Sequence, residues 1–163
     1  MGMAPKTSSS SAVTMTELVL PYHANVAGNM HGGEVMKLMD SAAGIVAARH
    51  CLTNVVTASV TQLSFIEPIF VGDLVLCHAE LIYAGRTSME VFVSVKAEDL
   101  VKGTVKYVSE GYFFMVSLDR NGRPKNVPPL KIENEHQQRL FDDAKIRIAK
   151  MKPSKMPSES HGT

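Results

Sequence analysis

Between residues 87 and 97 the sequence alternates between two faces, and this pattern limits the possible folds more than any other feature. One face carries the apolar side chains Met89, Val91, Val93, Val95 and Ala97, and the other carries Ser88, Glu90, Ser94 and Lys96. A period of two over this length is typical of an antiparallel strand that is buried on one side. Such a strand needs a second layer that covers its apolar face.

Three further segments have the composition of strands, at residues 55–65, 72–83 and 104–118. Gly72 and Asp73 open the second of these, and Gly85 and Arg86 turn the chain into the alternating segment. Consecutive strands with short connections pair antiparallel. A shorter strand at residues 15–20 precedes them. The sequence therefore predicts one antiparallel sheet.

Two segments have helical periodicity. Residues 33–50 carry one apolar face and, beside it, a stripe of mostly small residues that also holds Asp40; the stripe consists of Met36, Ala43, Gly44 and Ala47. Small residues let another backbone approach closely, so we expect this stripe to pack against another segment as well. Two faces suited to packing predict a central helix, on which we expect Asp40 to be shielded from water. Residues 135–150, capped by Asn134, have a single apolar stripe. Together these elements predict the α+β class.

Length and composition suggest a single domain, because the chain has 163 residues and 45% hydrophobic content. We expect a disordered lead-in at residues 1–12, a folded domain at 13–130, a C-terminal helix at 131–150 and a disordered tail at 151–163. The formal net charge of +1 gives no general attraction to nucleic acid or to acidic membranes, and no apolar run approaches the ~20 residues of a membrane span. Cys51 and Cys77 read as buried thiols of a cytoplasmic protein.

The stretch from Asn25 to Asp40 joins a polar loop to the start of the long helix. Amides near Gly32 and Gly33 lie at the helix N-terminus, where unpaired N–H groups and the helix dipole favour negative charge. Such amides are suited to an oxyanion hole. His31 forms no metal-ligand spacing with the other histidines, so we interpret it as structural and expect no metal.

Residues 24–33, which read Ala-Asn-Val-Ala-Gly-Asn-Met-His-Gly-Gly, and the later pair Met39 and Asp40 resemble the signature of the hotdog acyl-CoA thioesterases. The resemblance is strongest to the cytosolic (brain-type) acyl-coenzyme A hydrolase group, and residues 65–73 and 83–90 resemble two further blocks of that group. It extends from about Met15 to Pro129 and implies a hotdog fold, with a curved antiparallel sheet wrapped around a long central helix. The C-terminal helix is appended to it.

The resemblance also implies an activity, the hydrolysis of fatty acyl-CoA to free fatty acid and CoA. Asp40 then serves as general base or water activator, and Asn25 positions the water or the thioester carbonyl. Arg86, Thr87 and Ser88 would contact CoA phosphate; the alternative is an ordinary polar hairpin. CoA enters only as part of the substrate, so no separate cofactor is expected. The family pattern pairs the Asn of one protomer with the Asp of the other, which implies a homodimer with shared sites, assembled as a trimer of dimers.

Three alternatives stay open at this stage. Water can attack the thioester directly, or Asp40 can form an anhydride first. A hotdog dehydratase is the rival enzyme, although that class uses a His with an acid partner. The rival of another class is a non-catalytic sensor that binds acyl-CoA or a nucleotide.

Overall fold

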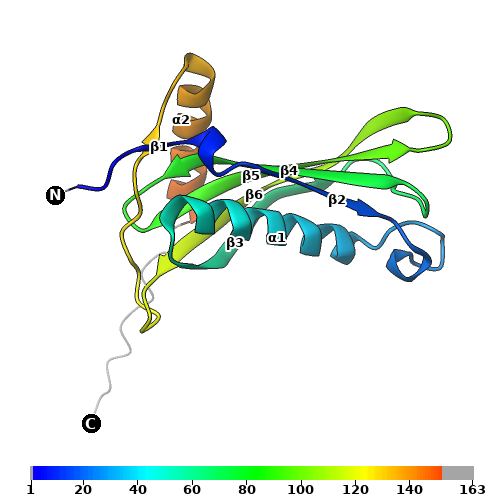
Figure 1. Cartoon of the computed structure of the whole chain (residues 1–163), viewed down its shortest axis with the longest axis horizontal. Helices are drawn as coiled ribbons and strands as arrows, with labels where there is room; N and C mark the ends of the chain where they lie inside the picture. The colour runs from blue at the N-terminus through cyan, green and yellow to red at the C-terminus, as the bar shows by residue number, and fades with distance from the viewer. Residues whose placement is uncertain (1, 152–163) are drawn as a thin grey trace, which may run out of the picture.

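The computed structural model describes residues 2–151, and its main feature is a five-stranded antiparallel sheet with one long helix along a face (Figure 1). The strands are β2 (Val13–Leu18), β3 (Asn54–Phe65), β4 (Leu74–Ala84), β5 (Ser88–Asp99) and β6 (Thr104–Leu118), in the spatial order β2-β4-β5-β6-β3. The helix is α1 (Gly32–Cys51). This is the expected hotdog arrangement, and the strand predictions are confirmed with small shifts at their ends.

The core lies between α1 and the sheet. The alternating face of β5 supplies Met89, Val91, Val93 and Val95, all of them 0% exposed. Val35, Leu38, Met39, Ala42 and Val46 of α1 pack against this face and are buried as well. The period-two pattern of β5 and the helical period of α1 therefore meet in one apolar layer.

The prediction that residues 1–12 are disordered is wrong for residues 6–10, which form secondary structure. β1 (Lys6–Thr7) pairs in parallel with β7 (Leu130–Lys131), and a 3-10 turn at Ser8–Ser10 follows. The Lys6 ammonium donates to the carbonyl of His50 at 2.8 Å, and the buried Ser8 hydroxyl donates to the carbonyl of Leu81 at 2.8 Å. Tertiary contacts order a serine-rich segment that has no strand pattern of its own.

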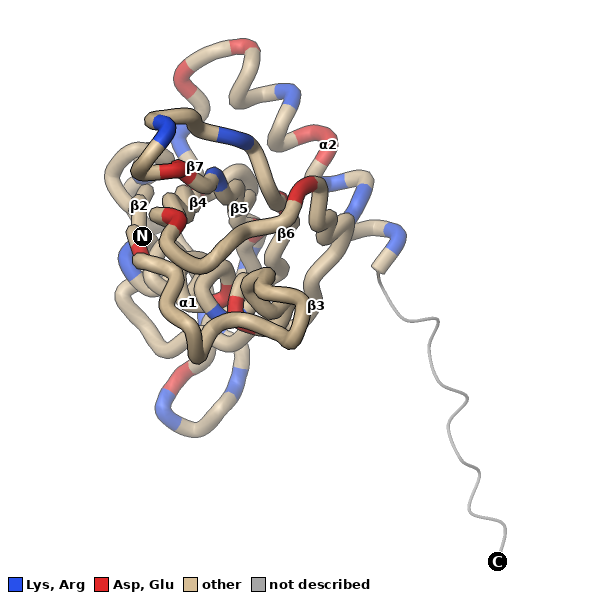
Figure 2. The backbone as a smooth tube through the Cα atoms, turned by 90° about the vertical axis from the view of Figure 1, so that its right-hand side faces the viewer, with Lys and Arg blue, Asp and Glu red and all other residues tan. Residues whose placement is uncertain are grey.

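The last helix, α2 (Glu135–Met151), covers one end of the opposite face of the sheet. Asn134 caps it, because its side-chain oxygen accepts the Gln137 N–H at 2.9 Å, as predicted. Arg147 of α2 reaches Glu90, which lies on the face of β5 that points away from α1. Figure 2 shows acidic and basic residues interspersed along α2. The predicted tail, apart from Met151, lies outside the described residues.

β3 forms one margin of the sheet. It pairs with β6 alone, so its other edge is unpaired within residues 2–151. Its register shifts between Thr57 and Ser59 and again between Thr61 and Ser64, and Gln62 has a φ of 51°. An edge strand with free N–H and C=O groups is able to pair with another chain.

Candidate active site

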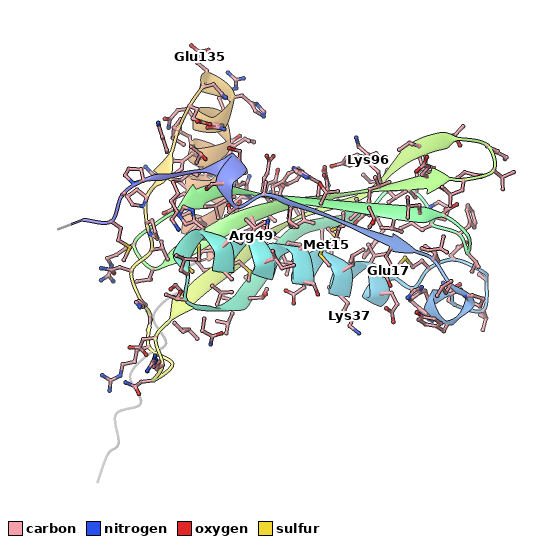
Figure 3. The ribbon with its side chains drawn as sticks, in the orientation of Figure 1. Met15, Glu17, Lys37, Arg49, Lys96 and Glu135 are labelled. Carbon is pink, nitrogen blue, oxygen red and sulfur yellow. The ribbon has the colours of Figure 1, made fainter. Side chains whose placement is uncertain are left out.

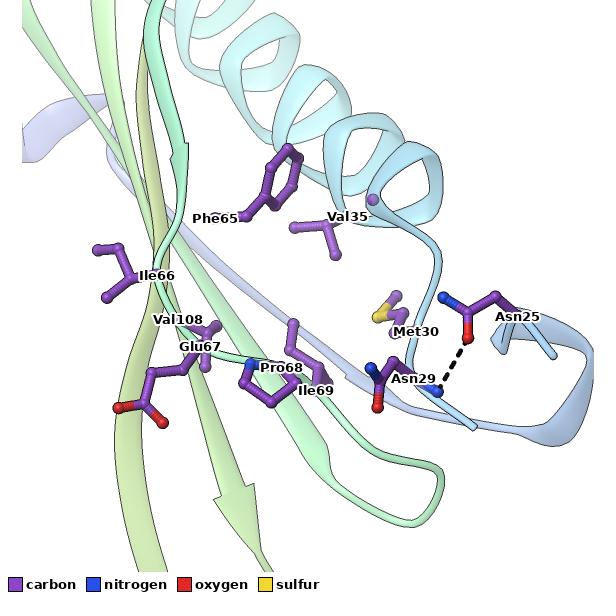
Figure 4. A pocket seen from close by; sticks show the side chains of 11 residues that line it. Asn25, Asn29, Met30, Val35, Phe65, Ile66, Glu67, Pro68, Ile69 and Val108 are labelled. Atoms are coloured by element: carbon purple, nitrogen blue, oxygen red, sulfur yellow. Dashed lines mark hydrogen bonds between the residues drawn. The ribbon is translucent and has the colours of Figure 1, made fainter. Parts of the chain in front are cut away.

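Asn25 stands at the start of a tight turn and stabilises that turn with its own side chain. Its Oδ1 accepts the N–H groups of Ala27 at 3.0 Å and Asn29 at 3.2 Å. Its carbonyl accepts the N–H of Gly28, whose φ of +84° favours glycine. Because the oxygen is held by two backbone donors, the amide nitrogen is the atom left for a ligand, and Figure 4 shows it turned toward the pocket.

This pocket has a volume of about 290 Å³ and lies between the Asn25 loop, the start of α1 and the segment after β3 (Figure 4). Its wall is mostly apolar, with polar groups at one side. The lining residues are Asn25, Asn29, Met30, Gly32, Val35, Phe65, Ile66, Glu67, Pro68, Ile69 and Val108. An apolar cleft with a few convergent polar groups is the usual form of a small-molecule site.

The N-terminus of α1 contributes Gly32 to the pocket wall, whereas Gly33 does not line it. His31 is the N-cap residue, and its carbonyl accepts the N–H groups of Glu34 at 3.0 Å and Val35 at 3.2 Å. The His31 side chain makes no capping hydrogen bond, so it does not occupy the first amides of the helix. The Phe65 ring packs against the start of the helix at Gly32, where an added Cβ would lie 3.4 Å from the ring.

Asp40 does not share this pocket. It lies eight residues beyond Gly32 in α1, which is about 12 Å along the helix at 1.5 Å per residue. Its carboxylate accepts a hydrogen bond from the Thr57 hydroxyl of β3 at 2.5 Å. The expectation that Asp40 is shielded is wrong for the single chain, because its side chain is exposed beside the edge of β3 that is unpaired within residues 2–151.

The stripe of α1 that carries Asp40 is only half covered. Ala43 and Ala47 are buried, but Met36 is 40% exposed. A Cβ added at Gly44 would meet no atom within 4 Å. The predicted close approach of another backbone to this stripe is therefore not made by the described part of the chain.

Arg86, Thr87 and Ser88 lie at the turn between β4 and β5. The carbonyl of Arg86 accepts the Val127 N–H, and that of Thr87 accepts the Ser117 N–H, so backbone bonds fix the turn. The Arg86 side chain is exposed. This turn lies at the far end of β4 from the Asn25 loop, separated from it by a strand of 11 residues, which spans roughly 35 Å. Within one chain, Asn25, Asp40 and the turn at residues 86–88 are thus not brought together.

Thr57 is the residue that sequence reasoning missed. It is one of several β-branched residues in its strand, and no local pattern distinguishes it. Only the packing of α1 along β3 brings its hydroxyl to Asp40, and the same hydroxyl also lies 3.4 Å from the Met115 sulfur. A donor at this position fixes the orientation of the carboxylate.

Other candidate groups contribute nothing to the pocket. Among residues 2–151 no cluster of three or more His, Cys, Asp and Glu side chains is arranged to hold a metal ion. Cys51 and Cys77 are buried free thiols, and burial raises the pKa of Cys77 to about 12. Neither helix of the described chain is long and apolar enough to cross a membrane.

Comparisons with known proteins show which family this chain belongs to. The Thioesterase superfamily profile matches residues 27–104. A Bacillus subtilis protein named uncharacterized acyl-CoA thioester hydrolase YkhA is 35% identical over 150 residues, which cover 92% of this chain and 87% of that protein. This chain belongs to the thioesterase superfamily. The cytosolic acyl coenzyme A thioester hydrolase of Mus musculus is 39% identical over 150 residues, and this superfamily member spans 39% of that protein's length.

Solved structures agree. A structure described as an apo-hexameric acyl-CoA thioesterase matches with a TM-score of 0.86 and 33% identity, covering 91% of this chain and 95% of that one. The Staphylococcus aureus acyl-CoA hydrolase in complex with butyryl coenzyme A, coenzyme A and coenzyme A disulfide has a TM-score of 0.81 and 33% identity, covering 89% and 88%. Variants of that enzyme with an Asp, an Asn or a Thr changed to Ala have also been solved.

Proposed function

We propose that this chain is an acyl-CoA thioesterase that hydrolyses fatty acyl-CoA to free fatty acid and CoA. The observation that carries the proposal is a match of residue type and spacing. In the S. aureus variants the replaced Asn and Asp are 15 positions apart, and the replaced Asp and Thr are 17 apart. Asn25, Asp40 and Thr57 have the same order and the same separations.

Each of the three side chains has a role that suits its contacts. Asp40 takes a proton from the attacking water, and Thr57 holds the carboxylate in position by its 2.5 Å hydrogen bond. The water oxygen bonds to the thioester carbon, and negative charge develops on the carbonyl oxygen. The amide nitrogen of Asn25 and the amides near Gly32 and Gly33 donate to that oxygen. The C–S bond then breaks, and the CoA sulfur takes the proton as it leaves.

Of the two roles open for Asn25, the structure favours contact with the carbonyl. Its Oδ1 already accepts two backbone N–H groups, so the free part of the amide is a donor. A donor suits the carbonyl oxygen, which becomes negative in the transition state. We prefer direct attack by water as the mechanism over an Asp40 anhydride.

We place the complete site between two chains. Asn25 and Asp40 open to different regions of one chain, and the exposed face that carries Asp40 borders the free edge of β3. Antiparallel pairing of two β3 edges about a two-fold axis would set the Phe65 end of one strand beside the Asn54 end of its partner. That pairing carries the Asn25 pocket of one protomer toward Asp40 of the other. It also covers Met36 and Gly44, which the single chain leaves open.

The same arrangement supports CoA contact by Arg86, Thr87 and Ser88 across the dimer. Ser88 lies in register with Val116 of β6, which in turn pairs with Val56 of β3. The turn is therefore at the Asn54 end of β3, which faces the Asn25 pocket of the partner in the proposed dimer. An exposed guanidinium there suits a phosphate. The hexameric relatives support a trimer of such dimers, and the word cytosolic in the mammalian names supports a cytoplasmic location.

The first test separates chemistry from binding. Asp40→Asn removes the base while keeping the acceptor for Thr57, and we expect thiol release from acyl-CoAs of graded chain length to fall 10²–10⁴-fold. CoA binding should stay within a few-fold. Asn25→Asp is the matched variant on the other side, because it keeps the turn acceptor and removes the donor; a loss of about 10²–10³-fold is expected. Near-normal turnover in Asp40→Asn would refute the assignment.

A mixed dimer tests the shared site. Asn25→Ala chains and Asp40→Ala chains are each inactive alone, but a heterodimer contains one site with both residues intact. We expect it to recover about half of the wild-type rate, and no recovery would show that each chain has its own site. Binding of acyl-CoA without thiol release by the wild type would favour the sensor. Interconversion of 3-hydroxyacyl and enoyl thioesters would favour the dehydratase.

A further inference from the structure

A buried histidine lies two residues before Asn25 and has both ring nitrogens engaged. The Nδ1 of His23 accepts the backbone N–H of Leu20 at 2.9 Å. Its Nε2 lies 2.9 Å from the Glu17 carboxylate, and its side chain is 4% exposed. Because Nδ1 is an acceptor, the ring proton of the neutral form is on Nε2 and is donated to Glu17. A single tautomer, and hence a single ring orientation, satisfies both partners.

This histidine joins three parts of the structure that meet at the Asn25 loop. Glu17 belongs to β2, and Figure 3 shows it at the end of that strand that leads into the loop. The His23 carbonyl accepts the N–H of His31, the N-cap residue of α1, at 2.8 Å. The loop is therefore tied through His23 to the sheet on one side and to the helix start on the other.

We propose that His23, held by Glu17, is a positioning residue for Asn25. The inference rests on the proposed function, in which the Asn25 amide nitrogen contacts the substrate. The turn that presents this nitrogen is short, and the bonds of the Asn25 side chain fix the amide relative to residues 25–29. The far end of the turn is tied to the segment after β3 by the bridge between Asn29 and Phe70, which leaves the start of the turn to be fixed. The His23–Glu17 pair fixes the start of that turn relative to the sheet. Since a displacement of about 1 Å costs on the order of 10²-fold in rate, this contact acts on turnover without touching the substrate.

Glu17 offers a direct test because it is half-buried at an edge strand, where substitution leaves the core intact. We expect Glu17→Ala to lower kcat about tenfold while the KM for an acyl-CoA stays within about twofold. Glu17→Gln keeps an oxygen that accepts from Nε2, so it should restore kcat to within about twofold of wild type. The matched control is Thr16→Ala, an exposed position next along β2, which should leave both constants unchanged.

A second measurement reports on the loop itself. Hydrogen exchange of the Ala27 and Asn29 amides, which Asn25 accepts, should be faster in Glu17→Ala and normal in Glu17→Gln. Unchanged kcat in Glu17→Ala would overturn the proposal, as would an equal loss in both Glu17 variants. A loss of activity that only follows the folded fraction, with normal exchange in the folded protein, would also overturn it. Absence of thioester hydrolysis in the wild type refutes the proposed function instead, and the exchange measurement still shows whether Glu17 holds the loop.

Discussion

The buried pair of Glu90 and Arg147 allows a stability prediction whose size follows from the structure. The Arg147 guanidinium donates from two nitrogens to Oε1 of Glu90, one of them at 2.8 Å, and it stacks 3.7 Å over the Tyr112 ring. The Glu90 side chain is 0% exposed and the Arg147 side chain 13%. Oε2 of Glu90 has no partner among the described residues. Arg147→Met keeps the aliphatic contact and removes the positive charge, so it leaves the buried Glu90 carboxylate without its ion-pair partner.

Protonation sets the upper limit of the cost. Burial raises the pKa of Glu90 above its ordinary 4.5, and the nearby Arg147 opposes that rise. Without Arg147, the buried Glu90 carboxyl can become neutral by binding a proton. At pH 7 this proton uptake costs at most about 3.4 kcal/mol, because pH 7 lies above the ordinary pKa of 4.5 and each pH unit corresponds to about 1.36 kcal/mol. Loss of the guanidinium stacking on Tyr112 adds roughly 0.5–1 kcal/mol. We therefore expect Arg147→Met to lower the free energy of unfolding by at most about 4 kcal/mol at pH 7.

The sign of the pH dependence follows from linkage. A carboxyl whose folded pKa is raised binds more protons in the folded state, so its penalty is absent below the unfolded pKa and appears as the pH rises. The penalty in Arg147→Met should shrink between pH 7 and pH 5, by at most about 2.7 kcal/mol. Urea unfolding at fixed protein concentration measures it. Adding Glu90→Gln should make the Arg147→Met penalty nearly independent of pH. An equal penalty at both pH values would refute the reasoning.

Three further predictions concern single side chains. Thr57→Val should lower kcat about tenfold with KM nearly unchanged, because it frees the Asp40 carboxylate; steady-state thiol release measures it, and Thr57→Ser should restore most of the rate. Leu52, at φ 56° in the C-cap of α1 and 79% exposed, is strained by about 1 kcal/mol, so Leu52→Gly should raise the free energy of urea unfolding; a lower value would contradict this. Ser8→Ala should lower the free energy of unfolding by about 1 kcal/mol, because it removes the buried hydrogen bond from the Ser8 hydroxyl to the carbonyl of Leu81. Thermal melts of the full chain check it, and no change would mean that the lead-in contributes nothing to stability.

Sequence periodicity was enough to predict most of the fold. The alternation in β5 and the apolar face of α1 follow from side-chain direction alone, and the bounds of β6 agree with those predicted. The prediction of a disordered lead-in is wrong because contacts with residues far along the chain order this segment. Lys6 binds the end of α1, and Ser8 binds β4. A serine-rich segment of this kind carries no local sign of such contacts.

The candidate site also combines local features, which the sequence predicts, with a long-range contact, which it does not. The turn at Asn25 and the helix start at Gly32 are local, so the sequence predicts them. The partner of Asp40 is not local, since Thr57 reaches it only through the packing of α1 on β3. The small residues around Asp40 indicated that its stripe faces another backbone. They did not indicate that the described chain leaves the stripe open, because composition does not distinguish a partner within the chain from one outside it.

The edge of β3 that no strand of residues 2–151 pairs with has a consequence for variants of this protein. An exposed strand of 12 residues invites association with unrelated strands and aggregation. In the proposed dimer, the edge that completes the active site is also the edge that is protected. Substitutions that weaken this pairing should therefore reduce solubility and turnover together. A screen for soluble expression would then select variants whose active sites are intact, without an activity assay.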